Sequence, residues 1–142
     1  MAERRTAYLL DTHIWIWWMI GADPLRSFPA RERIARAIDE ESARVSVISL
    51  WEVGMLEAHK RISLTVDVET WTRQALSSPG LSLAPLTPDI ALASSRLPGE
   101  IHGDPADRML IATARSLGAT LVTRDRRILE YSQAGHVTTL AV

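Results

Sequence analysis

Residues 8–18 read Tyr-Leu-Leu-Asp-Thr-His-Ile-Trp-Ile-Trp-Trp, with one aspartate near the middle of a strongly apolar stretch. The short apolar segment 7–10 is typical of a buried strand, and residues 12–20 are predicted to form a helix that ends at Gly-Ala-Asp-Pro, 21–24. Asp11 therefore separates a buried strand from a helix. Because an ionised carboxylate is costly to bury without a partner, the surroundings of Asp11 are the first question about function.

The rest of the chain continues this alternation of short apolar strands with helices. Further strands are predicted at 44–48, 81–86, 119–123 and 137–140. Helices are predicted at 30–41, 50–60, 66–76, 88–96, 104–117 and 126–131, with a turn at 77–80 and a loop at 97–103. The alternation predicts a three-layer α/β/α fold around a mostly parallel central sheet. The length of 142 residues indicates one domain over residues 1–142.

The composition excludes several classes of site. The chain has no cysteine, which removes disulfides, thiolate metal ligands and cysteine nucleophiles together. Its formal net charge of −1 neither favours nor excludes a nucleic-acid partner. The apolar run 14–20 is too short to cross a bilayer, and no signal-peptide cleavage pattern follows the N-terminal segment. We therefore expect a soluble, cytoplasmic protein with no membrane partner.

Acidic residues follow two of the predicted strands. Asp11 ends the first strand and Asp125 follows the strand at 119–123. Ligands of open α/β sheets bind at the carboxyl ends of the strands, so both acids fall where a ligand is expected. Asp104 and Asp107 open a helix in the pattern Asp-Pro-Ala-Asp, and Glu52 lies early in the helix after the second strand.

Two of these acids lie on the apolar side of their helices. Glu52 shares a face with Met55 and Leu56, and Asp107 shares a face with Leu110 and its neighbours. A structural role explains each acid taken alone. Asp11, Asp104 and Asp125 are good helix N-caps, and Glu52 suits a buried salt bridge to an arginine.

The acids taken together are harder to explain structurally, because several carboxylates at one sheet edge repel each other. A divalent cation relieves that repulsion, and Mg²⁺ and Mn²⁺ prefer oxygen ligands. The sequence contains no zinc-binding pattern. We expect surface or structural roles for the four histidines, which are His13, His59, His102 and His136.

Four segments in order resemble the PIN-domain family. They are Leu-Leu-Asp-Thr-His at 9–13, Ile-Ser-Leu-Trp-Glu at 48–52, His-Gly-Asp-Pro-Ala-Asp-Arg at 102–108, and Leu-Val-Thr-Arg-Asp at 121–125. The resemblance spans most of the chain, from Tyr8 to Asp125. More narrowly, the chain is similar to VapC toxins of type II toxin–antitoxin systems.

The resemblance implies a ribonuclease that depends on Mg²⁺ or Mn²⁺ and hydrolyses RNA phosphodiester bonds by metal-activated water. Its catalytic acids match Asp11, Glu52, Asp107 and Asp125. Asp107 is expected to be the nearer carboxylate of its segment. Asp104 remains open as a further metal ligand or as a cap that supports the site.

Hydroxyl and guanidinium groups flank these acids. The resemblance assigns Thr12 and Thr123 to hydrogen bonds with the carboxylates or with a metal-bound water. The arginines next to the acids are candidates for binding the RNA backbone, with ion pairing to acids of the chain as the equal alternative. They are Arg108, Arg124, Arg126 and Arg127.

The resemblance also implies partners. Related toxins form homodimers and bind a VapB-like antitoxin, in heterotetramers or larger assemblies, and the antitoxin often presents an arginine to the acids. Trp15, Trp17, Trp18 and Trp51 are candidates for these interfaces or for the core, and the three in the first helix cannot all face one side. The main alternative function is a catalytically silent PIN-like module that binds RNA or protein. A receiver domain and a haloacid-dehalogenase-type phosphatase fit less well, because Lys60 is in the wrong part of the chain and position 13 is histidine.

Overall fold

A computed structural model describes residues 6–21 and 29–142. The described strands form one five-stranded sheet in the order β3-β2-β1-β4-β5, with every neighbouring pair parallel. The strands are β1 (Tyr8–Leu10), β2 (Ala43–Ser46), β3 (Leu81–Ala84), β4 (Thr120–Thr123) and β5 (Thr139–Ala141). The predicted parallel sheet is confirmed, and the described part of it contains no antiparallel strand.

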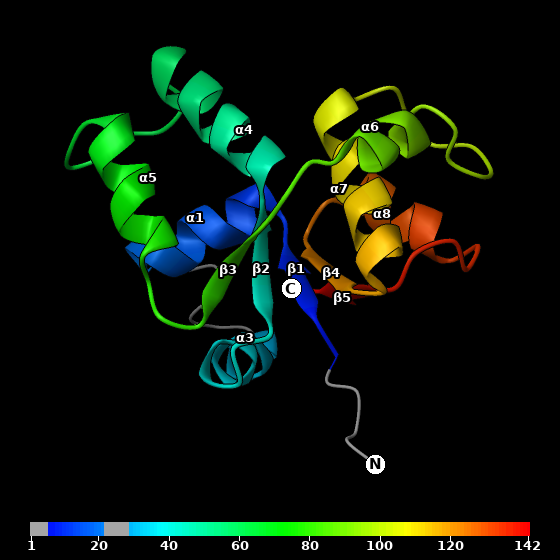
Figure 1. Ribbon diagram of the computed structural model, residues 1–142, viewed down its shortest axis with the longest axis horizontal. Coiled ribbons are helices and arrows are strands. Elements are labelled where there is room, and N and C mark those ends of the chain that lie inside the picture. Colours follow the sequence, from blue (N-terminus) through cyan, green and yellow to red (C-terminus); the bar gives the residue numbers. More distant parts are fainter. Residues whose placement is uncertain (1–5, 22–28) are drawn as a thin grey trace.

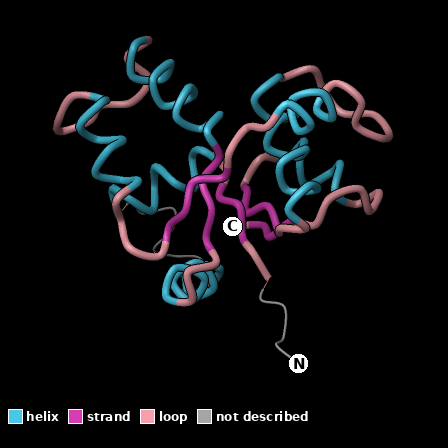
Figure 2. The backbone as a smooth tube through the Cα atoms, viewed as in Figure 1, coloured by secondary structure: helices cyan, strands magenta, loops and turns pink. Residues whose placement is uncertain are grey.

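Helices pack on both faces of this sheet (Figure 1). They are α1 (Thr12–Ile20), α3 (Ala30–Asp39), α4 (Val47–Ala58), α5 (Val68–Leu76), α6 (Pro88–Ser94), α7 (Pro105–Leu117) and α8 (Arg126–Ser132). Figure 2 shows most of the helices in two groups with the strands between them, while α3 lies apart, below the sheet in this view. The three-layer α/β/α architecture predicted from the alternation of elements is therefore confirmed.

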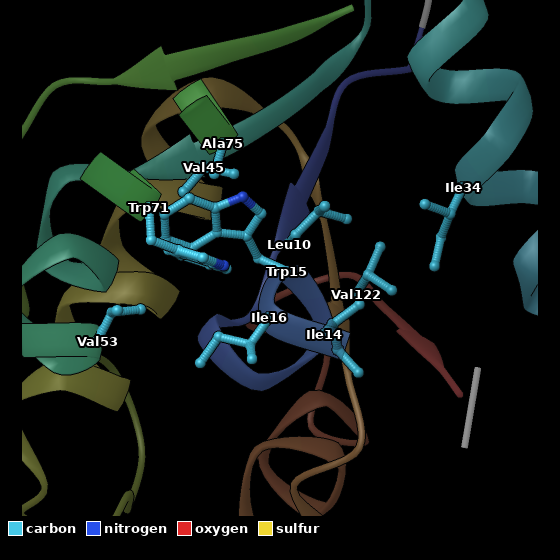
Figure 3. Packing of buried hydrophobic residues seen from close by; sticks show 10 residues of the cluster. All are labelled: Leu10, Ile14, Trp15, Ile16, Ile34, Val45, Val53, Trp71, Ala75 and Val122. Atoms are coloured by element: carbon cyan, nitrogen blue, oxygen red, sulfur yellow. The ribbon is translucent and has the colours of Figure 1, made fainter. Parts of the chain in front are cut away.

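The alternating side chains of the strands supply two separate cores. Leu10 and Val45 face a cluster with Trp15 and Trp71, whose ring centroids are 5.3 Å apart (Figure 3). Leu9 belongs instead to a second cluster built on α7 and α8. Successive residues of a strand point to opposite faces, so strand β1 contributes to both cores.

The tryptophans divide between the core and the surface. Trp15 is completely buried, Trp17 and Trp18 are half-buried, and Trp51 is 56% exposed. The tryptophans of the first helix, predicted not to face one side together, accordingly differ in burial. No helix in the described ranges is both long enough and apolar enough to span a membrane.

The element boundaries mostly follow local capping. The largest difference lies at residues 47–48, predicted as strand but found as the first residues of α4. The hydroxyl of Ser46 accepts a hydrogen bond from the backbone N–H of Ile48 at 3.1 Å and caps the helix. Helix α5 likewise starts at Val68 rather than 66, because Asp67 is its N-cap. Gly21 ends α1 as predicted, and it does so in a left-handed conformation. Residues 22–24 of that predicted turn lie outside the described residues.

The strand order decides where a site can form. The chain moves from β1 outward to β2 and β3, and then returns to the other side of β1 with β4 and β5. Strands β1 and β4 therefore flank the point where the direction of winding reverses. In open α/β sheets, ligands bind outside the carboxyl ends of the strands at such a point, and Asp11 and Asp125 follow these two strands.

Candidate active site

A cavity of about 490 Å³ lies where the predicted acids meet. All five of the acids singled out in the sequence line it, although they come from four segments of the chain. They are Asp11, Glu52, Asp104, Asp107 and Asp125. The remaining lining residues are His13, Ile14, Trp17 and Arg124.

Asp11 is buried, and each of its carboxylate oxygens accepts a hydrogen bond. It is the N-cap of α1, where its Oδ1 accepts from the backbone N–H of Thr12 at 2.7 Å. Its Oδ2 accepts from the hydroxyl of Thr123, also at 2.7 Å. Burial raises the pKa of Asp11 above its usual range, and the bonds from Thr123 and Thr12 partly oppose this. The capping role and the site role therefore coincide in this residue.

Glu52 is hydrogen-bonded to Thr12, the first residue of α1. The hydroxyl of Thr12 donates to Glu52 Oε1 and lies 2.8 Å from the hydroxyl of Ser49. A threonine hydroxyl has one proton. Since that proton goes to Glu52, Ser49 donates to Thr12. Thr12 and Ser49 are both completely buried, so this chain of hydroxyls is shielded from solvent.

The environment of Glu52 favours its protonated form. Burial, more than any other cause, raises its pKa to about 7. The negative charges of Asp11 and Asp107 add to the increase, while the hydrogen bond from Thr12 opposes it. Ser49 did not stand out in the sequence. The only signal was its position three residues before Glu52, on the same face of the helix.

The two acids of the Asp-Pro-Ala-Asp segment differ in their surroundings. Asp104 is exposed and caps α7, where its Oδ1 accepts from the backbone N–H of Asp107 at 3.0 Å. Asp107 is partly buried, and its Oδ2 lies 2.7 Å from Nε2 of His102. Burial raises the pKa of Asp107 to about 6, with contributions from the charges of Asp104 and Asp11. Sequence reasoning missed the contact of His102 with a site acid.

Asp125 shares a threonine with Asp11. Its carboxylate caps α8 by accepting from the backbone N–H groups of Arg127 at 2.8 Å and Ile128 at 3.2 Å. Its own backbone N–H donates to the hydroxyl oxygen of Thr123 at 3.0 Å. Because that hydroxyl donates to Asp11, Thr123 connects the acids that follow β1 and β4.

The four arginines singled out in the sequence have different environments. Arg124 lines the cavity, with its guanidinium 5.8 Å from the centre of the Trp17 ring. Arg126 and Arg127 are exposed in the first turn of α8. Arg108 instead hydrogen-bonds the backbone carbonyls of Ser94, the last residue of α6, and of Ile101 and His102 in the loop before α7. Its guanidinium is therefore used to fix that loop.

The donor set around the cavity suits an oxygen-preferring cation. Carboxylates predominate, and their mutual repulsion contributes to the raised pKa values of Glu52 and Asp107. In the ranges that the structure describes, no three acidic or histidine side chains already converge on one point as a finished metal cage. Mg²⁺ keeps several waters and commonly uses only one or two carboxylates of the protein. The residues therefore fit a hydrated divalent ion better than a fully chelated one.

Comparison with known proteins identifies relatives along almost the whole chain. A sequence model of the family described as PIN domain matches residues 8–133. The chain is 35% identical over 133 residues to Ribonuclease VapC22 of Mycobacterium tuberculosis, covering 94% of this chain and 98% of that protein.

Solved structures show the same fold. The VapBC2 complex of Rickettsia felis, bound to a DNA fragment from its promoter, matches with a TM-score of 0.68 and 15% identity, over 96% of this chain and 98% of that chain. VapBC-5 of Mycobacterium tuberculosis, a member of the VapBC family of toxin–antitoxin systems, matches with a TM-score of 0.55 and 19% identity, over 97% of this chain and 100% of that chain.

Proposed function

Because the chain belongs to the PIN-domain family, we propose that it is a VapC-like ribonuclease that hydrolyses RNA phosphodiester bonds with a divalent cation. The observation that carries this proposal is the cavity that five acids from four segments line. The relative of 35% identity is named a ribonuclease, which supports the same reaction.

In this proposal, Asp11, Glu52 and Asp107 would hold one or two Mg²⁺ or Mn²⁺ ions. Asp125 assists directly or through water, and Asp104 caps α7 beside them. When bound, the cation supplies Lewis-acid activation of water and stabilises negative charge at phosphorus.

The residues of the chain prepare this site before RNA arrives. Thr123 orients Asp11 and Thr12 orients Glu52, each through a hydroxyl that donates to the carboxylate. These bonds favour the ionised carboxylates that a cation needs. Since the threonine hydroxyls are buried, they hold the acids without competition from solvent.

Arginines at the rim of the cavity would bind the RNA backbone. Arg124 lines the cavity, and Arg126 and Arg127 follow Asp125 directly on an exposed turn. Guanidinium groups suit bidentate contacts with phosphate. The proposal rests on these three arginines and not on Arg108, whose hydrogen bonds go to the backbone of the protein. Cleavage of RNA should therefore weaken as salt concentration rises.

We also propose that a VapB-like antitoxin inhibits the protein and that the toxin forms a homodimer within a heterotetramer or larger assembly. Similar solved structures are VapBC complexes, and a cavity rich in carboxylates is complementary to an arginine of a partner. Trp51 is 56% exposed on α4 and suits an interface. Co-expression with a cognate VapB-like antitoxin should abolish cleavage. Unchanged cleavage by the purified complex would reject this partner.

The test of the ribonuclease proposal is cleavage of a mixed RNA pool by purified, antitoxin-free protein. The reactions contain Mg²⁺, Mn²⁺ or EDTA and compare the wild type with Asp11→Asn. Asp89→Asn is a matched control, because it makes the same chemical change at an exposed residue of α6 that does not line the cavity. We expect cleavage that requires the metal, is lost in Asp11→Asn and is retained in Asp89→Asn. No cleavage by folded wild-type protein would favour the silent binding module instead.

A further inference from the structure

The loop between α6 and α7 is held by two side chains that do not belong to it. Arg108 donates from Nε to the carbonyl of Ser94 at 2.9 Å and from Nη1 to that of Ile101 at 3.2 Å. The hydroxyl of Tyr131, on α8, donates to the carbonyl of Pro98 at 2.6 Å. Side chains of two helices therefore anchor the backbone of this loop.

That histidine, His102, contacts a site acid through one ring nitrogen only. Its Nε2 lies 2.7 Å from Oδ2 of Asp107, and the two side chains are 15% and 17% exposed. Its other nitrogen, Nδ1, is buried and has no hydrogen-bond partner in the described part of the chain. Within the described part of the chain, Asp107 is therefore the only side chain that hydrogen-bonds to the ring.

The hydrogen-bonding capacity of imidazole assigns the direction of this bond. If Nδ1 carried a proton, a donor would be buried without an acceptor, and in an imidazolium that donor would also be charged. The tautomer with its proton on Nε2 buries no unpaired donor. In that tautomer Nε2–H donates to Oδ2, and Asp107 is the acceptor.

We propose that His102 is a positioning residue, which holds Oδ2 of Asp107 and leaves Oδ1 to face a divalent cation. This inference rests on the proposed metal-dependent function. The physical reason is repulsion between the acids. The negative charges of Asp104, Asp11 and Asp125 all repel that of Asp107. Repulsion favours an outward rotation of the Asp107 side chain, and the hydrogen bond from the anchored loop opposes that rotation. Hydrogen-bonding partners of metal ligands typically contribute 10–100-fold to metal affinity or activity.

The direct test is the affinity of metal-free protein for Mn²⁺, measured by isothermal titration calorimetry. His102→Leu removes the donor and keeps an apolar side chain of moderate size, whereas His102→Gln keeps an N–H donor at the end of a chain of comparable reach. His59→Gln is the matched control, because His59 caps the far end of α4 and does not line the cavity. We expect His102→Leu to lower Mn²⁺ affinity about 10–100-fold and His102→Gln to restore most of it.

A double-mutant cycle separates positioning from a general effect on structure. If His102 acts through Asp107, then adding His102→Leu to Asp107→Asn should change Mn²⁺ affinity by less than about twofold. Full additivity of the two losses would overturn the proposal, and so would wild-type affinity in His102→Leu. Equal losses in His102→Leu and His102→Gln would also overturn it. If His102→Leu does not fold, His102→Ala enters the same cycle with the same expectations.

The same experiment distinguishes this inference from the proposed function. Wild-type protein that binds Mn²⁺ but cleaves no RNA would reject the ribonuclease, while the His102 variants would still test positioning of Asp107. Wild-type protein that binds no Mn²⁺ would overturn both. RNA cleavage measured against Mg²⁺ concentration gives a further check. In His102→Leu, the Mg²⁺ concentration for half-maximal cleavage should rise by the same factor as the Mn²⁺ dissociation constant.

Discussion

Glu52→Gln should stabilise the metal-free protein at alkaline pH. Burial, chiefly, raises the pKa of Glu52 from 4.5 to about 7. The folded protein therefore binds this proton more tightly than the unfolded chain does. The stability that this group contributes is fully present below pH 4.5 and is lost as the pH rises through 7. Glutamine keeps the size of the side chain and an acceptor for Thr12 but carries no charge, so it avoids this loss.

The magnitude follows from the change in pKa. A rise from 4.5 to about 7 corresponds to roughly 3 kcal/mol, at about 1.4 kcal/mol for each tenfold change in the protonation equilibrium. Glu52 is only partly buried, and we reduce this to about 1–2 kcal/mol for screening by solvent. At pH 8 the melting temperature of Glu52→Gln should therefore exceed that of the wild type by about 3–7 °C. At pH 4.5 the difference should shrink to about 1 °C, because the group is then protonated in the folded protein.

The assay is thermal unfolding followed by circular dichroism in EDTA, at pH 4.5 and pH 8. Glu57→Gln makes the same chemical change on the same helix, outside the cavity, and should give no pH-dependent gain. Added Mg²⁺ should raise the melting temperature of the wild type and narrow its difference from Glu52→Gln. A Glu52→Gln protein that melts several degrees below the wild type at pH 8 would refute the reasoning. It would mean that the ionised Glu52 carboxylate stabilises the fold.

Three further predictions concern the hydroxyl support, one turn and the RNA contacts. Thr123→Val keeps the shape of the side chain but leaves Asp11 Oδ2 without its hydroxyl donor. This variant should cleave RNA about 10–100-fold more slowly, and its free energy of unfolding should be lower by about 1–3 kcal/mol. Normal cleavage would contradict this. Gly80 has a φ of +87°, and Gly80→Ala would put a Cβ 2.0 Å from the carbonyl oxygen of Ile38. Urea denaturation should therefore show a free energy of unfolding lower by at least about 2 kcal/mol. An unchanged urea midpoint would contradict this. Arg127→Ala should make the dependence of log RNA affinity on log salt concentration shallower by about 0.7 for a lost contact with single-stranded RNA, and an unchanged slope would remove Arg127 from the RNA interface.

Local patterns were sufficient for most of the secondary structure. Short apolar runs between turn residues predicted all five strands, and capping residues such as Asp104 and Asp125 marked the starts of helices. The error at residues 47–48 has a local origin as well. Val47 and Ile48 continue an apolar, β-branched run that favours a strand, but the hydroxyl of Ser46 ends the strand by capping α4.

The sequence by itself also predicted that two of the acids lie at one edge of the sheet. Once β1 and β4 are parallel strands of one sheet, Asp11 and Asp125 must lie at the same edge, whatever the packing of the rest. The position of Glu52 on an apolar helix face predicted that it turns inward, and the raised pKa of its carboxyl reflects that burial. The alternation of strands and helices and the spacing of apolar residues are regular enough to predict these positions from the sequence.

Only the tertiary structure decided which side chains hold the acids. Thr12 and Ser49 are 37 residues apart, and Asp11 and Thr123 are 112 apart, yet both pairs are hydrogen-bonded. The contacts before α7 were likewise decided by the tertiary structure. There, Arg108 hydrogen-bonds the backbone and His102 contacts Asp107. A hydrogen bond needs its donor and acceptor within about 3 Å and well aligned. Periodicity specifies the face on which a residue lies, whereas only the packing of whole elements brings two particular atoms to that distance.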